Sequence, residues 1–159
     1  MAKGVPAIVL AAGKSTRLGQ PKALVEWNGE TLVGRSARLL KESGCSPIIV
    51  VTRNELQVDV MMSCKEANIV VNPKPEDDRT GTLQVGLMSL VSELGRTPRR
   101  VIVSPVDRCG WNKETISALL DCNSNTSPMP SGHPLLLCEV EKVLSFPRDI
   151  SLRDSLSIE

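Results

Sequence analysis

The sequence predicts a single α/β domain whose mostly parallel, twisted sheet is covered by helices on both faces. Short, continuous apolar segments alternate along the chain with amphipathic segments of helical period, a pattern typical of parallel strands that are buried on both sides. The chain has 159 residues, of which 41% are apolar and only 2% aromatic. One aliphatic core spanning residues 1–159 is therefore expected.

The first half of the chain contains three predicted strands and two predicted helices. The first helix places its apolar residues at helical spacing, with Thr31 in the N-cap position and Gly44 after its end. Asn28-Gly29, just before that helix, is a turn signal. The predicted strands are residues 5–10, 47–52 and 68–71, and the predicted helices are residues 32–40 and 56–65.

The second half adds two strands, two helices and a polar loop. The next helix carries leucine and valine on one face and stops at Gly95, and Asn112 is positioned to cap the helix after it. A loop rich in Ser, Asn and Pro follows, and a short helical tail comes after the last strand. The predicted strands are residues 100–106 and 134–140, the helices residues 83–94 and 116–120, and the loop residues 123–132.

Composition excludes several function classes. A net charge of +1 argues against non-specific attraction to nucleic acid or an acidic membrane, and the scarcity of aromatic residues argues against a base-stacking platform. The basic cluster of Arg96, Arg99 and Arg100 is interpreted as a solvated loop. No apolar run reaches the length of a membrane span, and residues 1–6 lack the apolar core of a signal peptide, so a cytoplasmic protein is expected.

The cysteines and the histidine do not form a recognisable metal motif. The chain has five cysteines, none of them in a CxxC pair, and one histidine. Scattered reduced thiols are therefore expected, and a zinc site is not.

The loop after the first strand is the strongest functional signal. It lies within the stretch VLAAGKSTRLGQPKAL, at the carboxyl end of a strand, where parallel sheets bind their ligands. Ala11, Ala12 and Gly13 let backbone N–H groups approach an anion closely. Arg17 adds a planar fork of donors, and Lys22 adds a compact positive charge. Neither the P-loop spacing nor the dinucleotide-binding fingerprint is present.

Polar residues at other strand ends point to the same edge of the sheet. Asp107 and Asn72 each follow a predicted strand. Asp107 is also compatible with a simple capping or turn role, and Asn72 with closing a strand before Pro73. Thr82 is compatible with a first-turn helix residue that contacts no ligand.

The segment LAAGKSTRLGQPKAL resembles the signature L-A-A-G-x-S-x-R-x-G-x-x-K-x-L of the MobA-like nucleotidyltransferases, which include molybdenum-cofactor guanylyl- and cytidylyltransferases. Every fixed position is present from Leu10 to Leu24. GTLQVGL and PVD are similar to further family segments, and GHP and LRDSL resemble landmarks of the cytidylyltransferase branch. The resemblance implies a three-layer, Rossmann-like sandwich of the nucleotide-diphospho-sugar transferase type.

The resemblance also implies a reaction, in which an NMP unit passes from an NTP to a phosphorylated acceptor such as a molybdopterin-type cofactor, with release of pyrophosphate. Lys22 would lie on the α-phosphate, Arg17 on the leaving phosphates, and Asp107 would ligate Mg²⁺. His133 is interpreted as a surface-loop residue or an acceptor contact, because an attacking phosphate is already ionised. The nucleotide-binding residues would be Leu10, Ala11, Ala12, Gly13, Arg17, Lys22, Asn72, Gly81 and Thr82.

Departures from the family pattern leave alternatives open. Ala12, where guanylyltransferases usually have glycine, favours CTP over GTP. Cys109 stands where relatives usually have proline, and the domain is short at the C-terminus, where a further acidic segment is common. The alternatives are a non-catalytic nucleotide-binding or regulatory module with a weakened metal site, and a cytidylyl or sugar-phosphate nucleotidyltransferase with another acceptor. An exposed sheet edge would favour a homo-oligomer.

Overall fold

The structure, a computed structural model, describes residues 4–13, 22–74, 79–106, 110–128 and 133–147. Within these residues, one sheet has the strand order β5-β4-β1-β6-β7. The strands β5, β4, β1 and β6 are parallel to one another, and β7 runs antiparallel to β6. The strands are β1 (Ala7–Ala11), β4 (Ile48–Thr52), β5 (Asn68–Val71), β6 (Val101–Pro105) and β7 (Leu135–Leu137).

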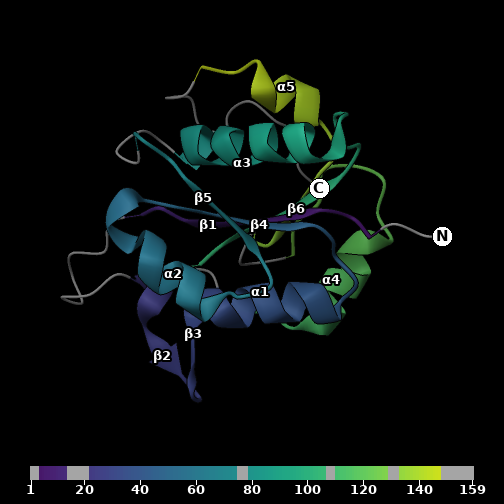
Figure 1. Ribbon diagram of the computed structural model, residues 1–159. Coiled ribbons are helices and arrows are strands. Elements are labelled where there is room, and N and C mark those ends of the chain that lie inside the picture. Colours follow the sequence, from purple (N-terminus) through teal and green to yellow (C-terminus); the bar gives the residue numbers. More distant parts are fainter. Residues whose placement is uncertain (1–3, 14–21, 75–78, 107–109, 129–132, 148–159) are drawn as a thin grey trace.

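Helices cover both faces of the sheet, so the predicted three-layer sandwich is confirmed (Figure 1). One layer is α1 (Leu32–Glu42), α2 (Gln57–Ser63) and α4 (Lys113–Leu120), and the other is α3 (Arg79–Leu94) and α5 (Val140–Leu144). Alternate strand residues divide between the layers: Val9 packs in the cluster that includes α1, and Ile8 in the cluster that includes α3. All residues of β1, β4, β6 and β7 are buried, as two covered faces require.

The capping residues predicted from the sequence lie where expected. The Thr31 hydroxyl accepts a hydrogen bond from the Gly34 N–H at 3.1 Å, and α1 begins at the next residue. Gly44, after the end of α1, has a φ of +94°, which glycine adopts without steric cost. Asn112 forms a capping box with Thr115 at the start of α4.

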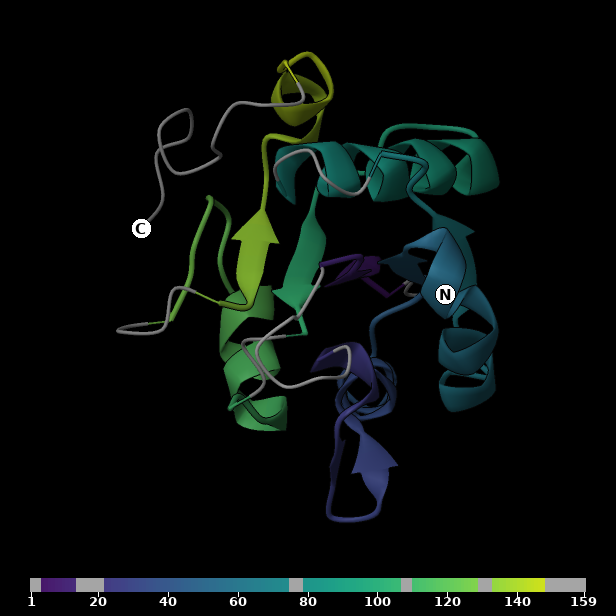
Figure 2. The same ribbon diagram turned by 90° about the vertical axis from the view of Figure 1, so that its left-hand side faces the viewer.

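Three elements differ from the sequence prediction. α3 begins at Arg79, because the threonine-containing first turn is buried against the sheet in spite of its modest helix propensity. β7 is shorter than predicted, and its Leu136 exchanges two backbone hydrogen bonds with Thr126 of the preceding loop. The Asn28-Gly29 turn closes a small hairpin that projects beyond α1 (Figure 2). The hairpin strands are β2 (Glu26–Trp27) and β3 (Glu30–Thr31).

The topology places the switch point of the sheet beside the end of β1. From β1 the chain moves outward to β4 and then β5, and only after α3 does it cross to β6 on the other side of β1. The strand order therefore switches between β1 and β6. In open parallel sheets, ligands bind outside the carboxyl ends of the strands at such a switch point. In Figure 1 these carboxyl ends lie on the left.

Gly86→Ala is expected to destabilise the fold by about 1–3 kcal/mol, because it overpacks the contact of α3 with the sheet. The new Cβ would lie 2.9 Å from the Cγ2 atoms of Ile8 and Val51, both of which belong to covered strands. Urea denaturation measures the change in the free energy of unfolding. A Cβ at Gly110 meets nothing within 4 Å, so Gly110→Ala is the matched control. Equal stability of Gly86→Ala and the unaltered chain would contradict this packing.

Candidate functional site

The end of β1 is held by hydrogen bonds to its carbonyl groups. The Leu10 carbonyl accepts from the backbone N–H of Val106 at 3.1 Å, just beyond β6. The Ala11 carbonyl accepts from the Thr52 hydroxyl at 3.0 Å, and the Ala12 carbonyl from the Arg53 guanidinium at 3.4 Å. Leu10, Ala11 and Ala12 are buried, whereas the next residue, a glycine, is exposed. The chain thus leaves the sheet at the switch point with the carbonyl groups of Leu10, Ala11 and Ala12 all accepting hydrogen bonds.

Asn72, directly after β5, is buried at the same edge and joins the strand end to the start of α3. Its side-chain N–H donates to the Thr82 hydroxyl at 3.0 Å, and its side-chain oxygen accepts from the Lys74 N–H at 2.9 Å. Its backbone N–H donates to the Thr52 carbonyl at 2.8 Å. Gly81 and Thr82 lie buried in the first turn of α3. Among these predicted nucleotide-binding residues, Asn72 and Thr82 are therefore partners of each other.

His133 reaches the same edge from the opposite strand direction. Val103 of β6 pairs with Leu135 of β7, and the two strands are antiparallel. The segment that enters β7 therefore lies beside the carboxyl end of β6. His133 therefore lies beside the carboxyl end of β6, near Val106.

The predicted charged residues of the site are only partly covered by the structure. Arg17 and Asp107 lie outside the described residues. Lys22 begins a 3-10 helix, η1 (Lys22–Leu24), in which the next residue, Ala23, is buried in the core on the α1 side. Val106, the residue before Asp107, is buried at the carboxyl edge. The described residues contain no group of three or more His, Cys, Asp or Glu that could hold a metal ion.

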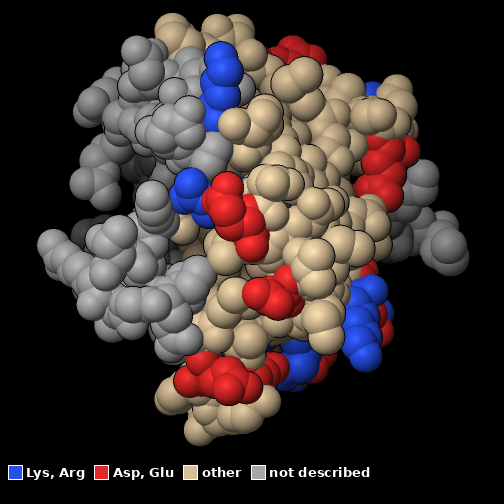
Figure 3. Space-filling model, turned by 60° about the vertical axis from the view of Figure 1, so that its left-hand side comes forward, with Lys and Arg blue, Asp and Glu red and all other residues tan. Residues whose placement is uncertain are grey.

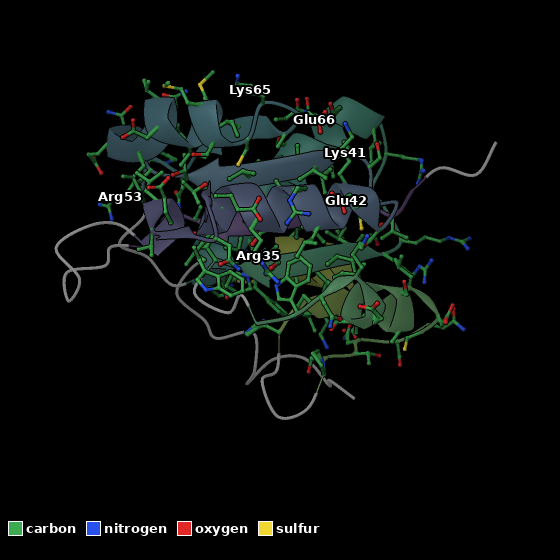
Figure 4. All side chains as sticks on the ribbon, turned by 90° about the horizontal axis from the view of Figure 1, so that it is seen from below. Arg35, Lys41, Glu42, Arg53, Lys65 and Glu66 are labelled. Carbon is green, nitrogen blue, oxygen red and sulfur yellow. The ribbon has the colours of Figure 1, made fainter. Side chains whose placement is uncertain are left out.

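Two residues at the end of β4 escaped the sequence analysis. Thr52 is completely buried, and the Arg53 side chain is 17% exposed. Besides the Ala12 carbonyl, Arg53 forms an ion pair with Glu55. Figure 4 shows Arg53 at the end of the molecule opposite Lys41 and Glu42. The signal was available, since a hydroxyl and a cation end a predicted parallel strand, but no local motif distinguishes them from ordinary strand-end residues.

Two of the described cysteines, Cys45 and Cys64, are unsuited to nucleophilic catalysis. Cys45, Cys64, Cys122 and Cys138 are free thiols. Burial raises the pKa of Cys45 to about 11 and that of Cys64 to about 12. Both remain protonated at neutral pH, and only the thiolate is a strong nucleophile.

Charges of both signs lie on the described surface. On the face shown in Figure 3, Lys and Arg side chains are interspersed with Asp and Glu. Within the described part of the chain, no helix is both long enough and apolar enough to cross a membrane.

The buried thiols give a prediction about pH. Their pKa values are raised on folding, so the stabilisation that they contribute is complete below about pH 8, where even an unfolded thiol is protonated. It is lost as the pH rises through about 11 and about 12. At pH 8, Cys45 and Cys64 are expected to react with dithiobisnitrobenzoate only as fast as the chain opens, whereas the half-buried Cys122 reacts directly. Mass spectrometry identifies the labelled residues, and equal rates for Cys45 and Cys122 would contradict the prediction.

Comparison with known proteins supports a family assignment and the fold. A "Probable molybdenum cofactor guanylyltransferase" from Opitutus terrae is 41% identical over 59 residues, which are 37% of this chain and 29% of that protein. "Nicotine blue oxidoreductase" from Paenarthrobacter nicotinovorans is 32% identical over 123 residues, 73% of this chain and 55% of that protein. The chain thus spans less than two-thirds of the length of both relatives.

The fold is shared with solved structures. Rv0371c from Mycobacterium tuberculosis H37Rv superposes with a TM-score of 0.78 at 18% identity, over 98% of this chain and 86% of that one. Its manganese complex superposes with a TM-score of 0.75. At this identity the likeness concerns the fold alone. The MobA-like NTP transferase domain matches residues 7–141, which is most of the sequence, and the chain therefore belongs to the MobA-like NTP transferase family.

Proposed function

We propose that the protein is a nucleotidyltransferase that moves an NMP unit from an NTP to a phosphorylated small-molecule acceptor. An acceptor phosphate oxygen attacks the α-phosphorus, a new phosphoanhydride bond forms, the bond between the α- and β-phosphates breaks, and pyrophosphate leaves with its electron pair. Both reactants are anionic. The protein therefore has to place them in line and stabilise negative charge, and little covalent work remains for its side chains.

The observation that carries this proposal is the loop of small residues at the switch point. Ala12 and Gly13 leave β1 at the switch point, where β1 pairs with β6, and Gly13 is exposed there. Backbone N–H groups at such a position favour a chain of phosphates. The family match covers this loop and both strands.

The roles proposed for Lys22 and Arg17 of the same loop follow from their positive charge and from the shape of their side chains. Lys22 would neutralise the α-phosphate, where charge builds up during transfer, and Arg17 would bind the leaving pyrophosphate through its planar fork. Leu10 and Ala11 would line the base and ribose with backbone groups. Asn72, Gly81 and Thr82 would complete the nucleotide side, and His133 would contact the acceptor.

A divalent cation at this site would be coordinated by few protein ligands. Asp107 follows a residue at the carboxyl edge, and Mg²⁺ commonly takes one or two carboxylates together with substrate phosphates and water. When bound, the cation would neutralise phosphate charge. We propose that Asp107 holds it. The manganese complex of the mycobacterial structural neighbour supports a divalent metal in this fold.

The acceptor and the base are proposed at the level of chemical class. A molybdopterin-type cofactor is the favoured acceptor, in line with the name of the Opitutus relative. Ala12 favours CTP, whereas that name specifies guanylyl transfer, so CTP and GTP are both to be tested. A non-catalytic nucleotide-binding or regulatory module is the second candidate, because Cys109, two residues after Asp107, departs from the family pattern.

Lys22→Ala is expected to reduce pyrophosphate release by about 10²–10³-fold, the usual effect of removing one electrostatic contact to a developing charge. The assay supplies each NTP with Mg²⁺ and a panel of phosphorylated acceptors, and measures pyrophosphate. Lys41→Ala is the matched control, because Lys41 is 53% exposed in a pair with Glu66 away from the switch point. Tight NTP binding without release for any acceptor would favour the binding module instead.

Removal of divalent metal is expected to abolish pyrophosphate release, with recovery on addition of Mg²⁺ or Mn²⁺. Asp107→Asn is expected to raise the metal concentration needed for half-maximal rate by at least about tenfold, because an amide is a much weaker metal ligand than a carboxylate. Asp121→Asn, at the exposed C-terminal end of α4, is the control. An unchanged metal requirement in Asp107→Asn would show that the cation is held elsewhere.

A further inference from the structure

We infer that Thr52 and Arg53 are positioning residues that hold the loop after β1 in an anion-binding conformation. They act on the backbone of Ala12 and Gly13, not on the substrate. The inference rests on the proposed function, since it identifies what keeps the phosphate-binding backbone in place.

The first step is that the end of β4 donates to two successive carbonyl groups. In a parallel sheet, successive carbonyl groups point alternately to the neighbour on either side. The Leu10 carbonyl bonds to Val106 on the β6 side, and the Ala11 carbonyl bonds to Thr52 on the β4 side. The Ala12 carbonyl accepts from the Arg53 guanidinium, which also comes from the end of β4.

The second step follows from planarity of the peptide bond. The N–H of a trans peptide points opposite to the carbonyl of the same peptide unit, and the cis bonds among the described residues are elsewhere, before Pro47 and Pro134. The Ala12 N–H therefore points away from Thr52, and the Gly13 N–H points away from Arg53. Successive backbone N–H groups can form a concavity that binds anions, and those of Ala12 and Gly13 lie directly after the carboxyl end of β1.

The third step is the restraint that Arg53 places on this peptide. Gly13 has no side chain, and a Cβ built there meets nothing within 4 Å, so packing of Gly13 against the described residues does not fix its conformation. The hydrogen bond from Arg53 to the Ala12 carbonyl restrains it. The ion pair with Glu55 orients the guanidinium and offsets part of its charge.

The test is binding of inorganic pyrophosphate and of a non-hydrolysable NTP analogue, measured by calorimetry. Thr52→Val and Arg53→Gln are each expected to weaken binding about tenfold, a change of about 1.4 kcal/mol. Thr52→Ser, which keeps the hydroxyl, is expected to bind as the unaltered chain does. Ser104→Ala is the control, because Ser104 has a buried hydroxyl in β6 with no hydrogen-bond partner.

A second readout separates positioning from stability. On addition of pyrophosphate, the amide NMR signals of Ala12 and Gly13 are expected to shift in the unaltered chain, and to shift much less in Thr52→Val. Urea denaturation of the same variants reports their stability. Loss of affinity without rescue by Thr52→Ser, or in variants that are partly unfolded under the binding conditions, would overturn the positioning role.

The outcomes distinguish the inference from the function on which it rests. If the unaltered chain binds neither pyrophosphate nor any NTP analogue, the proposed function fails and the inference fails with it. If the unaltered chain binds and both Thr52→Val and Arg53→Gln bind equally well, the inference alone is wrong. Weakened binding in both variants, with rescue by Thr52→Ser, supports it whether or not transfer is detected.

Discussion

The structure depends on the burial of a parallel sheet on both faces. Once helices cover both sides of β1, β4 and β6, side chains along these strands are cut off from water, and Thr52 and Ser104 are the polar residues among them. Polar chemistry is thereby confined to the strand ends. Thr52 shows the constraint at its limit, since it is completely buried yet bound to a carbonyl of the neighbouring strand end.

The same constraint fits the small residues at the end of β1. Ala11 and Ala12 are buried where the chain leaves the covered strand, and Gly13 after them is exposed. The hydrogen bonds that reach Leu10, Ala11 and Ala12 come from both adjacent strand ends, so the conformation of the loop is coupled to the register of the sheet. Asn72 extends this coupling to β5 and the start of α3.

Local signals predicted most of the fold, because they act over a few residues. Thr31 and Asn112 cap their helices, and apolar runs mark the buried strands. The roles of Thr52 and Arg53 could not be predicted in this way, since each depends on a residue 41 positions away that only the sheet register brings near. The direction of β7 could not be predicted either, because an apolar run is compatible with both parallel and antiparallel pairing.

The reversed direction of β7 has an evolutionary consequence. Because this strand runs against β6, the residues that precede it, and not those that follow it, approach the carboxyl end of β6. They belong to a different stretch of the chain from the loop after β1, and β6 lies between β1 and β7. Under the proposed function, mutation of one stretch would change which acceptor is bound while the other continues to bind the nucleotide. A fold of this kind can diversify its products by exchanging a single connection.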